Sequence, residues 1–374
     1  MRIGLNLLYL VPGAVGGSET YARELIASLG ELRPQDEFVV YCGNEAARTL
    51  PDPAWGSNVS VVNMAFDATN KPRRILVELL QLPRRAERDG AVLLHSLGTT
   101  TPLRGKLPRV VSVLDLVFHH FPQTFPRPAQ RGLELLVPRG ARRAARVIAI
   151  SQATKDDVVA TYGIAADKID VTLLGHGITD TAARTDEGEL RERFGIGDAS
   201  YALCVASGLA HKNIPRLLDA YAQTAGDHKL VIVGHAGLEH EKLVALAAEH
   251  GVGERVIFTG WAQDADLNGL YAAAEFFVYP TLLEGFGLPV LEAMARGVAV
   301  ACSNTSSLPE VAGDAALTFD PADTSAIAGA IERMFSDRAL RADLIERGRA
   351  RAAEFTWQRC AEQTWQSYEK ALAA

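Results

Sequence analysis

The sequence has few cysteines, no long apolar run and no segment of biased composition. Its four cysteines are scattered over 374 residues, with no CxxC pair and no nearby histidine cluster. This spacing excludes a disulfide scaffold, argues against a structural zinc site and suits a reducing cytosol, so we expect a cytoplasmic protein. No stretch approaches the roughly 18 consecutive apolar residues that a membrane span needs.

The N-terminus is apolar only as far as Val11 and lacks a small-residue cleavage site, which indicates a first strand rather than a signal peptide. Apolar residues make up 48% of the chain and charged residues 22%, which excludes disorder as the main state. At about 150 residues per domain, the length predicts two domains.

Charge is divided unevenly along the chain. Residues 1–170 hold 21 Lys and Arg against 17 Asp and Glu, whereas residues 171–374 hold 17 against 28. Opposite signs favour two domains with different partners. The net charge of −7 argues against a nucleic-acid partner.

Short β-branched runs alternate with helical spacing almost throughout, which predicts parallel βαβ units. The pattern breaks near residues 175–187 and then starts again. We therefore expect an α/β protein of two doubly wound, Rossmann-like domains, residues 1–175 and 176–355, facing across a cleft. A last helix, 356–374, is expected to cross back onto the first domain. Ligands of such sheets bind beyond the carboxyl ends of the strands.

The expected strands are named by their residues as follows: 2–8, 38–42, 59–63, 92–94, 110–113 and 147–150, then 202–205, 230–233, 256–259, 276–279 and 298–301. The helices expected in the second domain are 215–223, 238–250, 265–274 and 289–296.

The most informative stretch is residues 281–297, TLLEGFGLPVLEAMARG. Gly285 and Gly287 allow a turn that presents backbone N–H groups, and Pro289 suits the first turn of a helix. A glycine-rich loop that leads into a helix N-terminus is a ready phosphate site.

Two carboxylates flank this loop, Glu284 within it and Glu292 one turn into the helix. Phosphate would repel a carboxylate, so sugar hydroxyls are the expected partners of both. A plainer alternative is that Glu292 only interacts with the helix dipole and Glu284 is a solvated loop residue.

The string from Glu284 to Gly297 resembles the E-x7-E signature of glycosyltransferase family 4 and matches it at every fixed position. The members of this family are retaining nucleotide-sugar enzymes of GT-B fold. The resemblance covers nearly the whole chain, and it implies that residues 1–175 bind the acceptor and residues 176–355 bind the nucleotide-sugar donor. It implies that Glu284 is catalytic and that Glu292 holds the ribose. It also implies that the donor is bound by the loop residues Glu284, Gly285, Phe286, Gly287, Leu288, Pro289 and Val290.

Other segments carry the same resemblance. Gly16 and Gly17 match the family's N-terminal Gly-Gly-x-Glu turn, which the donor diphosphate approaches. Lys212, followed by Asn213, matches the diphosphate lysine, which we expect to act in catalysis. Trp261 ends a strand where relatives contact the base. Residues 306–311, SSLPEV, match the segment that closes the donor pocket.

The chain departs from the family pattern in two places. Many relatives have an arginine five or six residues before the lysine, where this chain has Ala206 and Ser207; we expect Ser207 to take part in donor binding. Many also read His-Asp-Leu near the reaction centre, where this chain reads Leu-Asp-Leu at 114–116. Asp115, His95 and His119 are candidate acceptor contacts, and the sequence does not decide among them.

The triplet Asp264-Ala265-Asp266 has the form of a metal-binding D-x-D, but Asp264 stands where a helix N-cap belongs. We therefore expect neither a metal nor a resident cofactor. Two arginine clusters, at residues 73–88 and 127–146, are interpreted either as solvated helix faces or as sites of peripheral contact with anionic lipid.

These features predict a metal-independent retaining hexosyltransferase. The expected donor is GDP-mannose, with a UDP-sugar as the alternative, and the expected acceptor is a glycan, a lipid-linked intermediate or a small glycoside. A non-catalytic nucleotide-sugar-binding module is a more remote alternative. A nicotinamide oxidoreductase is disfavoured, because the first turn is not G-x-G-x-x-G.

Overall fold

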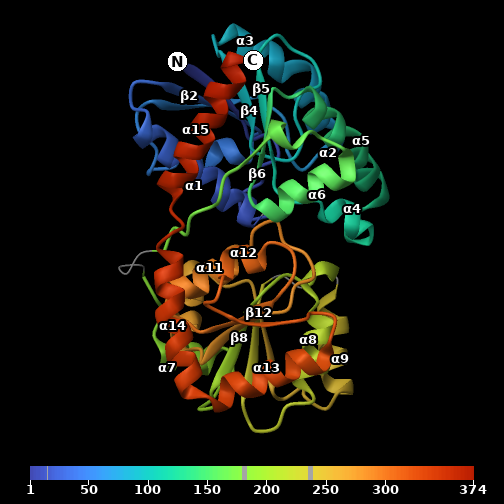
Figure 1. The fold of residues 1–374 in the computed structure, drawn as a ribbon, viewed down its shortest axis with the longest axis vertical. Coiled ribbons are helices and arrows are strands. Elements are labelled where there is room, and N and C mark those ends of the chain that lie inside the picture. Colours follow the sequence, from blue (N-terminus) through green and yellow to red (C-terminus); the bar gives the residue numbers. More distant parts are fainter. Residues whose placement is uncertain (15, 179–182, 235–238) are drawn as a thin grey trace. The chain divides into compact units, whose positions relative to one another are not determined.

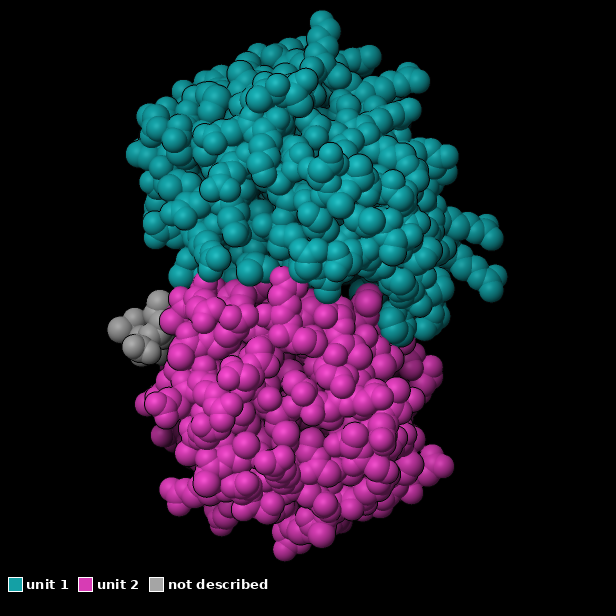
Figure 2. Space-filling model, viewed as in Figure 1, with its two compact units in different colours: residues 1–177, 356–374 teal, residues 178–355 magenta. Residues whose placement is uncertain are grey.

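The structure is a computed structural model that describes residues 1–14, 16–178, 183–234 and 239–374. It divides into two compact units (Figure 2). Unit 1 consists of residues 1–177 and 356–374, and unit 2 consists of residues 178–355. No described helix is long and apolar enough to cross a membrane.

Unit 1 is built on a seven-stranded parallel sheet in the order β3-β2-β1-β4-β5-β6-β7. Its strands are β1 (Arg2–Asn6), β2 (Glu37–Cys42), β3 (Val59–Asn63), β4 (Leu93–Ser96), β5 (Arg109–Val113), β6 (Arg146–Ala149) and β7 (Ile169–Val171). The chain first winds outward from β1 to β3 and then returns to β4 on the other side of β1. The topological switch point of this sheet therefore lies between β1 and β4.

Helices cover both faces of this sheet (Figure 1). They are α1 (Gly17–Leu32), α2 (Lys71–Leu76), the π-helical η2 (Val77–Gln81), α3 (Leu82–Arg88), α4 (Val117–His120), α5 (Arg127–Arg143), α6 (Gln152–Tyr162) and α15 (Trp357–Ala373), with short 3-10 turns η1 (Ala46–Arg48), η3 (Pro122–Thr124) and η4 (Ala166–Lys168). The C-terminal α15 packs against α1, β5 and β6, so it belongs to unit 1 although unit 2 precedes it in the chain.

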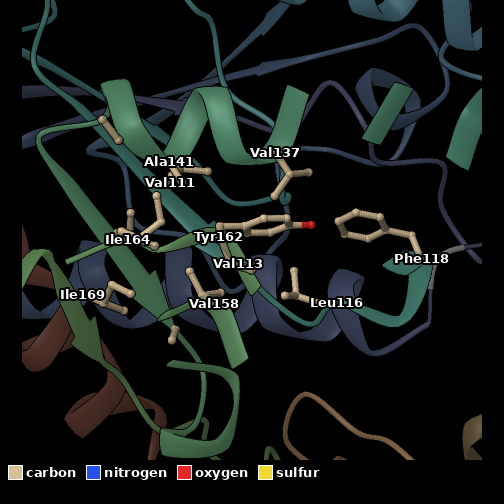
Figure 3. Close-up of a cluster of buried hydrophobic side chains, with 13 residues drawn as sticks. Val111, Val113, Leu116, Phe118, Val137, Ala141, Val158, Tyr162, Ile164 and Ile169 are labelled. Carbon is tan, nitrogen blue, oxygen red and sulfur yellow. The ribbon is translucent and has the colours of Figure 1, made fainter. Parts of the chain in front are cut away.

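Alternation along β5 shows how the two faces are filled. Val111 and Val113 point into a cluster formed with α5 and α6, in which Tyr162 is central and its hydroxyl is directed toward Phe118 (Figure 3). Ser112 lies between the two valines and points to the opposite face, where its Oγ is 2.7 Å from the Tyr21 hydroxyl of α1.

Unit 2 has a six-stranded parallel sheet in the order β10-β9-β8-β11-β12-β13. Its strands are β8 (Tyr201–Val205), β9 (Lys229–Val233), β10 (Val256–Gly260), β11 (Phe276–Tyr279), β12 (Val300–Ser303) and β13 (Leu317–Phe319). Its helices are α7 (Glu187–Arg193), η5 (Ala210–Lys212), α8 (Ile214–Tyr221), α9 (His240–Glu249), α10 (Asp264–Ala273), α11 (Leu288–Ala295), α12 (Leu308–Ala312), α13 (Thr324–Ser336) and α14 (Arg338–Ala352).

The expected fold class, two Rossmann-like parallel-sheet domains, is confirmed. The expectation missed β7 and β13, which are three-residue edge strands too short to show a pattern. It placed β12 two residues early, because Val298 still belongs to the turn that ends α11. The N-cap of α10 is Gln263 and not Asp264. Leu238, expected to start a helix, lies outside the described residues.

Candidate active site

The loop between β11 and α11 is a tight turn that only glycine can complete at its last position. Gly287 is the N-cap of α11 with φ +103°, and a Cβ there would lie 2.4 Å from Leu308 Cδ2. Gly285 does not adopt a positive φ, so only one of the two expected glycines is needed for the turn. Pro289 lies in the first turn of α11, where an N–H has no intrahelical acceptor.

Glu284 collects three polar groups at one carboxylate oxygen. Its Oε1 lies 2.6 Å from Lys212 Nζ, 2.9 Å from the Tyr279 hydroxyl and 2.9 Å from Thr281 Oγ1. The Lys212 ammonium also donates to the Tyr279 hydroxyl at 2.9 Å. The Glu284 and Lys212 side chains are only 12% and 17% exposed, so the ion pair is largely shielded from water.

Burial alone would raise the pKa of Glu284, but the Lys212 ammonium and its hydrogen bond outweigh that effect and hold the pKa below its ordinary value. Neighbouring His211 is the opposite case. Burial, with the Lys212 charge adding to it, lowers the pKa of His211 to about 4, so its ring is neutral near pH 7. The site therefore carries one fixed cation beside one fixed carboxylate.

Two serines that precede α12 hold the loop from the other side. Ser306 Oγ donates to the Glu284 carbonyl at 2.6 Å and accepts from the Glu284 N–H at 3.1 Å. Ser307 Oγ, which is fully buried, lies 2.8 Å from the Phe286 carbonyl. The sequence pointed to residues 306–311 only through the family resemblance, and it did not reveal that these hydroxyls fix the backbone of Glu284.

The segment that carries Lys212 is fastened to the same loop. The Leu282 N–H donates to the His211 carbonyl at 2.7 Å. Asn213 is buried in a left-handed conformation, and its Nδ2 donates to the carbonyls of Pro280 and Pro321 at 3.0 and 2.9 Å. Contrary to expectation, the Asn213 amide therefore orders the loop and is not directed at a donor.

The rest of the predicted loop presents backbone rather than side chains. Phe286 and Val290 are buried, and the Val290 N–H donates to the Gly287 carbonyl at 3.0 Å. Val290 is thus a core residue whose amide is used within the turn, which corrects its expected donor contact. The N–H groups of Gly287 and Leu288 are those that open α11.

Glu292 lies on α11, and its Oε2 is 3.6 Å from Nη1 of Arg296, one turn further along the helix. Burial raises the pKa of Glu292, and the Arg296 charge opposes that rise. Arg296 Nη2 donates to Asn268 Oδ1 at 2.7 Å, and the guanidinium lies over the Tyr271 ring. Glu292 is therefore a positioned, 23% exposed carboxyl and not a freely solvated one.

Two further predicted donor residues lie in unit 2 but outside this cluster. Ser207 is partly buried in the turn that follows β8. Trp261, 58% exposed, lines a separate hollow of about 650 Å³ with Arg193 and Asp266. Asp266 accepts from Thr185 Oγ1 and from Arg193 Nη2, both at 2.6 Å, so this half of the D-x-D triplet is an ion-pair residue.

In unit 1 the predicted glycine turn opens α1. Gly16 is the N-cap of α1 and Gly17 its first residue. Glu19 turns back from the helix so that its Oε2 accepts the Gly13 N–H at 2.8 Å, while its Oε1 accepts from Arg23 at 2.9 Å. The acidic residue of Gly-Gly-x-Glu thus braces the loop that precedes the helix.

His95 is a core residue, which corrects its expected acceptor contact. It is 0% exposed, its Nδ1 is 2.7 Å from the Tyr368 hydroxyl and its Nε2 is 2.8 Å from Ser112 Oγ. Because both ring nitrogens are used and no face reaches solvent, His95 ties β4 to α15 and β5 and is not presented to a ligand. Burial lowers its pKa to about 3.

The other acceptor candidates lie around α4. Asp115 Oδ1 accepts the Val117 N–H at 2.9 Å, which braces the start of the helix. His119 pairs with Glu134 at 2.9 Å, and His120 pairs with Asp157 at the same distance. The side chains of both histidines are more than a third exposed, so these contacts contribute little to stability.

The geometry of unit 2 gathers a lysine ammonium, the N–H groups that open a helix and a carboxylate within a shielded loop. A cation and helix N–H groups stabilise a phosphate-like leaving group, and a carboxylate suits sugar hydroxyls or a developing positive charge. Two Rossmann-like units with such a site define a nucleotide-sugar glycosyltransferase of GT-B fold.

Comparison with known proteins agrees with this class. A family model described as Glycosyltransferase Family 4 matches residues 15–175, and one described as Glycosyl transferases group 1 matches residues 186–351. The chain is 32% identical over 367 residues to O-antigen chain mannosyltransferase B of Escherichia coli, covering 94% of this chain and 96% of the relative. The chain belongs to glycosyltransferase family 4.

Two other matches extend the comparison. The chain is 33% identical over 245 residues to MMP alpha-(1->4)-mannosyltransferase of Mycolicibacterium hassiacum, covering 63% of this chain and 56% of the relative. The structure of sucrose-phosphate synthase from Thermosynechococcus elongatus aligns with a TM-score of 0.78 at 21% identity, covering 100% of this chain and 99% of that one. This structural likeness shows the fold.

Proposed function

We propose that this glycosyltransferase moves a mannosyl group from GDP-mannose to a hydroxyl of a glycan or lipid-linked acceptor, with retention at the anomeric carbon and without a metal. The observation that carries the proposal is the Lys212–Glu284 pair, 2.6 Å apart in the loop that opens α11. The choice of mannose is supported by the Escherichia coli O-antigen mannosyltransferase, which is similar over nearly its full length.

The bond that breaks joins the anomeric carbon to the donor diphosphate. Negative charge then grows on the leaving phosphate, where Lys212 and the N–H groups of Gly287 and Leu288 stabilise it. Because these groups are fixed before reaction, little reorganisation is needed, which is the basis of electrostatic catalysis. They also supply positive charge at the place where a divalent cation would otherwise be needed.

Positive charge grows on the sugar ring, and Glu284 is the carboxylate available to stabilise it and to bind a sugar hydroxyl. Glu292, eight residues further along, binds the ribose. Retention follows if the departing phosphate oxygen takes the acceptor proton on the face that it leaves. Proton NMR of the freshly formed product, which reports the anomeric configuration, tests this step.

The first experiment is thermal unfolding of the protein with GDP, UDP, ADP or dTDP, each with and without EDTA. A ligand at 100 times its Kd adds about 2.7 kcal/mol, which raises Tm by a few degrees in a chain of this size. We expect GDP alone to stabilise, equally with EDTA present. Stabilisation by UDP alone would replace GDP-mannose with a UDP-sugar, and no stabilisation by any nucleotide would contradict the donor site.

Peripheral contact with anionic lipid is a further part of the proposal. It is supported by Leu76 and Leu80, which are 44% and 54% exposed on the segment that also exposes Arg73, Arg84 and Arg88. Exposed leucines between arginines suit the headgroup region of a negatively charged bilayer. Co-sedimentation with vesicles that contain phosphatidylglycerol, but not with pure phosphatidylcholine vesicles, is the expected result.

A further inference from the structure

Strand β11 contributes a side chain to the candidate active site that the reaction steps above do not use. Tyr279 is the last residue of β11 and is only 1% exposed. Its hydroxyl lies between the two charged groups of the site, 2.9 Å from Lys212 Nζ and 2.9 Å from Glu284 Oε1. The sequence did not point to Tyr279 as a site residue, because the family signature begins five residues later, at Glu284.

The direction of these two hydrogen bonds is fixed by the chemistry of the three groups. A lysine ammonium only donates and an ionised carboxylate only accepts, whereas a phenol does both. The Tyr279 oxygen therefore accepts from Lys212, and its single proton is left for Glu284. Burial and the Glu284 charge raise the pKa of Tyr279 well above its ordinary value, so the phenol keeps this proton.

Thr281 supplies the other hydroxyl at the same carboxylate oxygen, but that hydroxyl has competing acceptors. Thr281 Oγ1 lies 2.9 Å from Glu284 Oε1. It also lies 2.9 Å from the His211 carbonyl and 3.2 Å from the Leu283 carbonyl. All three oxygens are acceptors, and a hydroxyl has one proton to give. Tyr279 is therefore the neutral donor that is dedicated to the Glu284 carboxylate.

The two oxygens of the Glu284 carboxylate have different surroundings. The donors Lys212 and Tyr279 fill the two lone-pair sites of Oε1. Oε2 has no hydrogen-bond partner among the residues that the structure describes, and it is not one of the buried side-chain atoms that lack a partner. Part of Oε2 is therefore accessible, and a ligand hydroxyl that meets this carboxylate meets Oε2.

Tyr279 is anchored in the middle of the unit 2 sheet. Its strand lies between β8 and β12, and Ser303 Oγ of β12 donates to the Tyr279 carbonyl at 3.2 Å. Its ring packs on the Phe277 ring, with the two centroids 5.7 Å apart. A group on a strand is held more precisely than a group on a loop, so β11 gives the loop carboxylate of Glu284 a fixed point of attachment.

We propose that Tyr279 is a positioning residue of the transfer reaction. Its hydroxyl holds Oε1 of Glu284, so that Oε2 is the oxygen presented to a hydroxyl of the donor sugar. The proposal rests on the proposed function in taking Glu284 to act on that sugar. It does not depend on which nucleotide carries the sugar or on the identity of the acceptor.

Tyr279→Phe tests this role, because it removes one oxygen atom and keeps the ring. The probes are GDP-mannose and GDP, with UDP-glucose and UDP in their place if UDP is the nucleotide that stabilises the protein. Nucleotide release from the sugar donor, with water as the acceptor, gives kcat, and calorimetric titration gives the Kd of the free nucleotide. We expect kcat to fall about tenfold, because a hydrogen bond to a charged group is lost. The Kd should change less than about twofold, because Lys212 and the α11 N–H groups stay in place.

Tyr201→Phe is the matched control. Tyr201, on the neighbouring strand β8, is also 1% exposed, and its hydroxyl donates to the Leu270 carbonyl of α10 at 2.7 Å. Both variants lose one buried hydrogen bond, so both should lose some thermal stability, but Tyr201→Phe should keep the kcat of the wild type. Equal losses of kcat in the two variants would mean general damage and would overturn the proposal.

Combination with Glu284→Gln separates a positioning role from a merely structural one. If Tyr279 acts through the Glu284 carboxylate, adding Tyr279→Phe to Glu284→Gln should change kcat by less than about twofold, because the charge that it positions is already gone. Losses that multiply in the double variant would overturn the proposal. So would a wild-type kcat in Tyr279→Phe, or a rise in the Kd of the nucleotide as large as the fall in kcat.

The same variants distinguish this outcome from a failure of the proposed function. Near-normal kcat in Glu284→Gln would remove the catalytic role of the carboxylate, and the positioning role of Tyr279 with it. A low kcat in Glu284→Gln beside a wild-type kcat in Tyr279→Phe would overturn the positioning role alone.

Discussion

The two units are both parallel Rossmann-like sheets, yet the polar groups at their carboxyl edges are assembled differently. In unit 2, Lys212 and Glu284 form an ion pair beside the N–H groups that open α11, and the loop Glu284–Leu288 supplies most of the site from one stretch of chain. In unit 1, Asn6, Glu78 and Thr100 come from three separate segments and meet in a buried network.

The difference lies in how much of the chain each arrangement needs. A diphosphate needs positive charge and backbone donors, and a glycine-rich loop that enters a helix provides both over a few residues. A buried side-chain network needs groups from several segments of the chain. Helix N-termini are therefore a local feature of sequence, whereas such a network depends on tertiary structure.

The largest expected effect on this comparison is at Glu284. Replacing Glu284 by Gln keeps its shape but removes the negative charge that faces Lys212 and the developing sugar cation. We expect kcat to fall about 10²–10³-fold, the size of loss seen when one transition-state electrostatic contact is removed. The nucleotide-induced Tm shift should remain, because Lys212 and the α11 N–H groups stay in place.

Steady-state kinetics with saturating donor, alongside the thermal-shift assay, measure this change. Glu249→Gln, an exposed carboxylate near the end of α9, is the control and should be neutral. Near-normal turnover in Glu284→Gln would remove the catalytic role from the carboxylate and leave it as the partner that orients Lys212.

The second effect tests whether the unit 2 loop depends on its backbone. Gly287→Ala adds a Cβ at φ +103° and 2.4 Å from Leu308 Cδ2, so either the turn or α12 must move. We expect a loss of about 1–3 kcal/mol in stability. Calorimetry measures it, and Gly329→Ala on α13, where a Cβ would meet nothing within 4 Å, is the control. Equal Tm values for the two variants would contradict the strained turn.

The same contrast explains how much of the site could be predicted. The Glu284–Gly297 string is contiguous, so turn chemistry and a family signature both apply to it, and the turn, the helix and its proline were found. Ser306 and Ser307 form hydrogen bonds to that loop from more than twenty residues away, and no local sequence pattern predicts such hydrogen bonds. Glu78 lies 72 residues from Asn6, and its hydrogen bond to Asn6 could likewise not be predicted from the sequence.

His95 shows the opposite error. A histidine near the end of a strand invites a functional interpretation, but its burial depends on which element packs over it. Here that element is α15, whose Tyr368 is 273 residues further along the chain. β7 and β13 were missed for a related reason. A strand of three residues is defined by its hydrogen-bonded neighbour rather than by its own sequence.

The third expected effect is a loss of stability of unit 1 at low pH, caused by His95. Its pKa is about 3 when folded, against about 6.5 in an unfolded chain, so between these values the unfolded state binds more protons. Stability is then lost as pH falls below 6.5, by about 1.4 kcal/mol for each pH unit, until about pH 3. Above 6.5 the stabilisation is fully present.

Urea unfolding at pH 7.0 and 5.5, followed by tryptophan fluorescence, measures this loss, because three of the four tryptophans are buried in unit 1 and the fourth, Trp261, is exposed. The wild type should lose more stability between the two pH values than His95→Gln does. His211 in unit 2, with a pKa of about 4, is unchanged in both proteins and cancels in the comparison. Parallel pH slopes for the two proteins would show that His95 takes up its proton without unfolding the core.

The smallest expected effect concerns the support of the unit 2 loop. Ser307→Ala leaves the Phe286 carbonyl, now 2.8 Å from Ser307 Oγ, and the Glu284 carbonyl, 3.1 Å away, without that hydroxyl. One lost buried hydrogen bond costs about 1 kcal/mol, which corresponds to roughly fivefold in an equilibrium constant. We expect Tm to fall slightly and kcat to fall by no more than that factor, because Glu284 keeps its Lys212 and Tyr279 partners.

Ser325→Ala, exposed on α13, is the control and should change neither Tm nor kcat. If kcat in Ser307→Ala falls as far as in Glu284→Gln, the position of the carboxylate matters as much as its charge, and unit 2 then depends on distant contacts as unit 1 does.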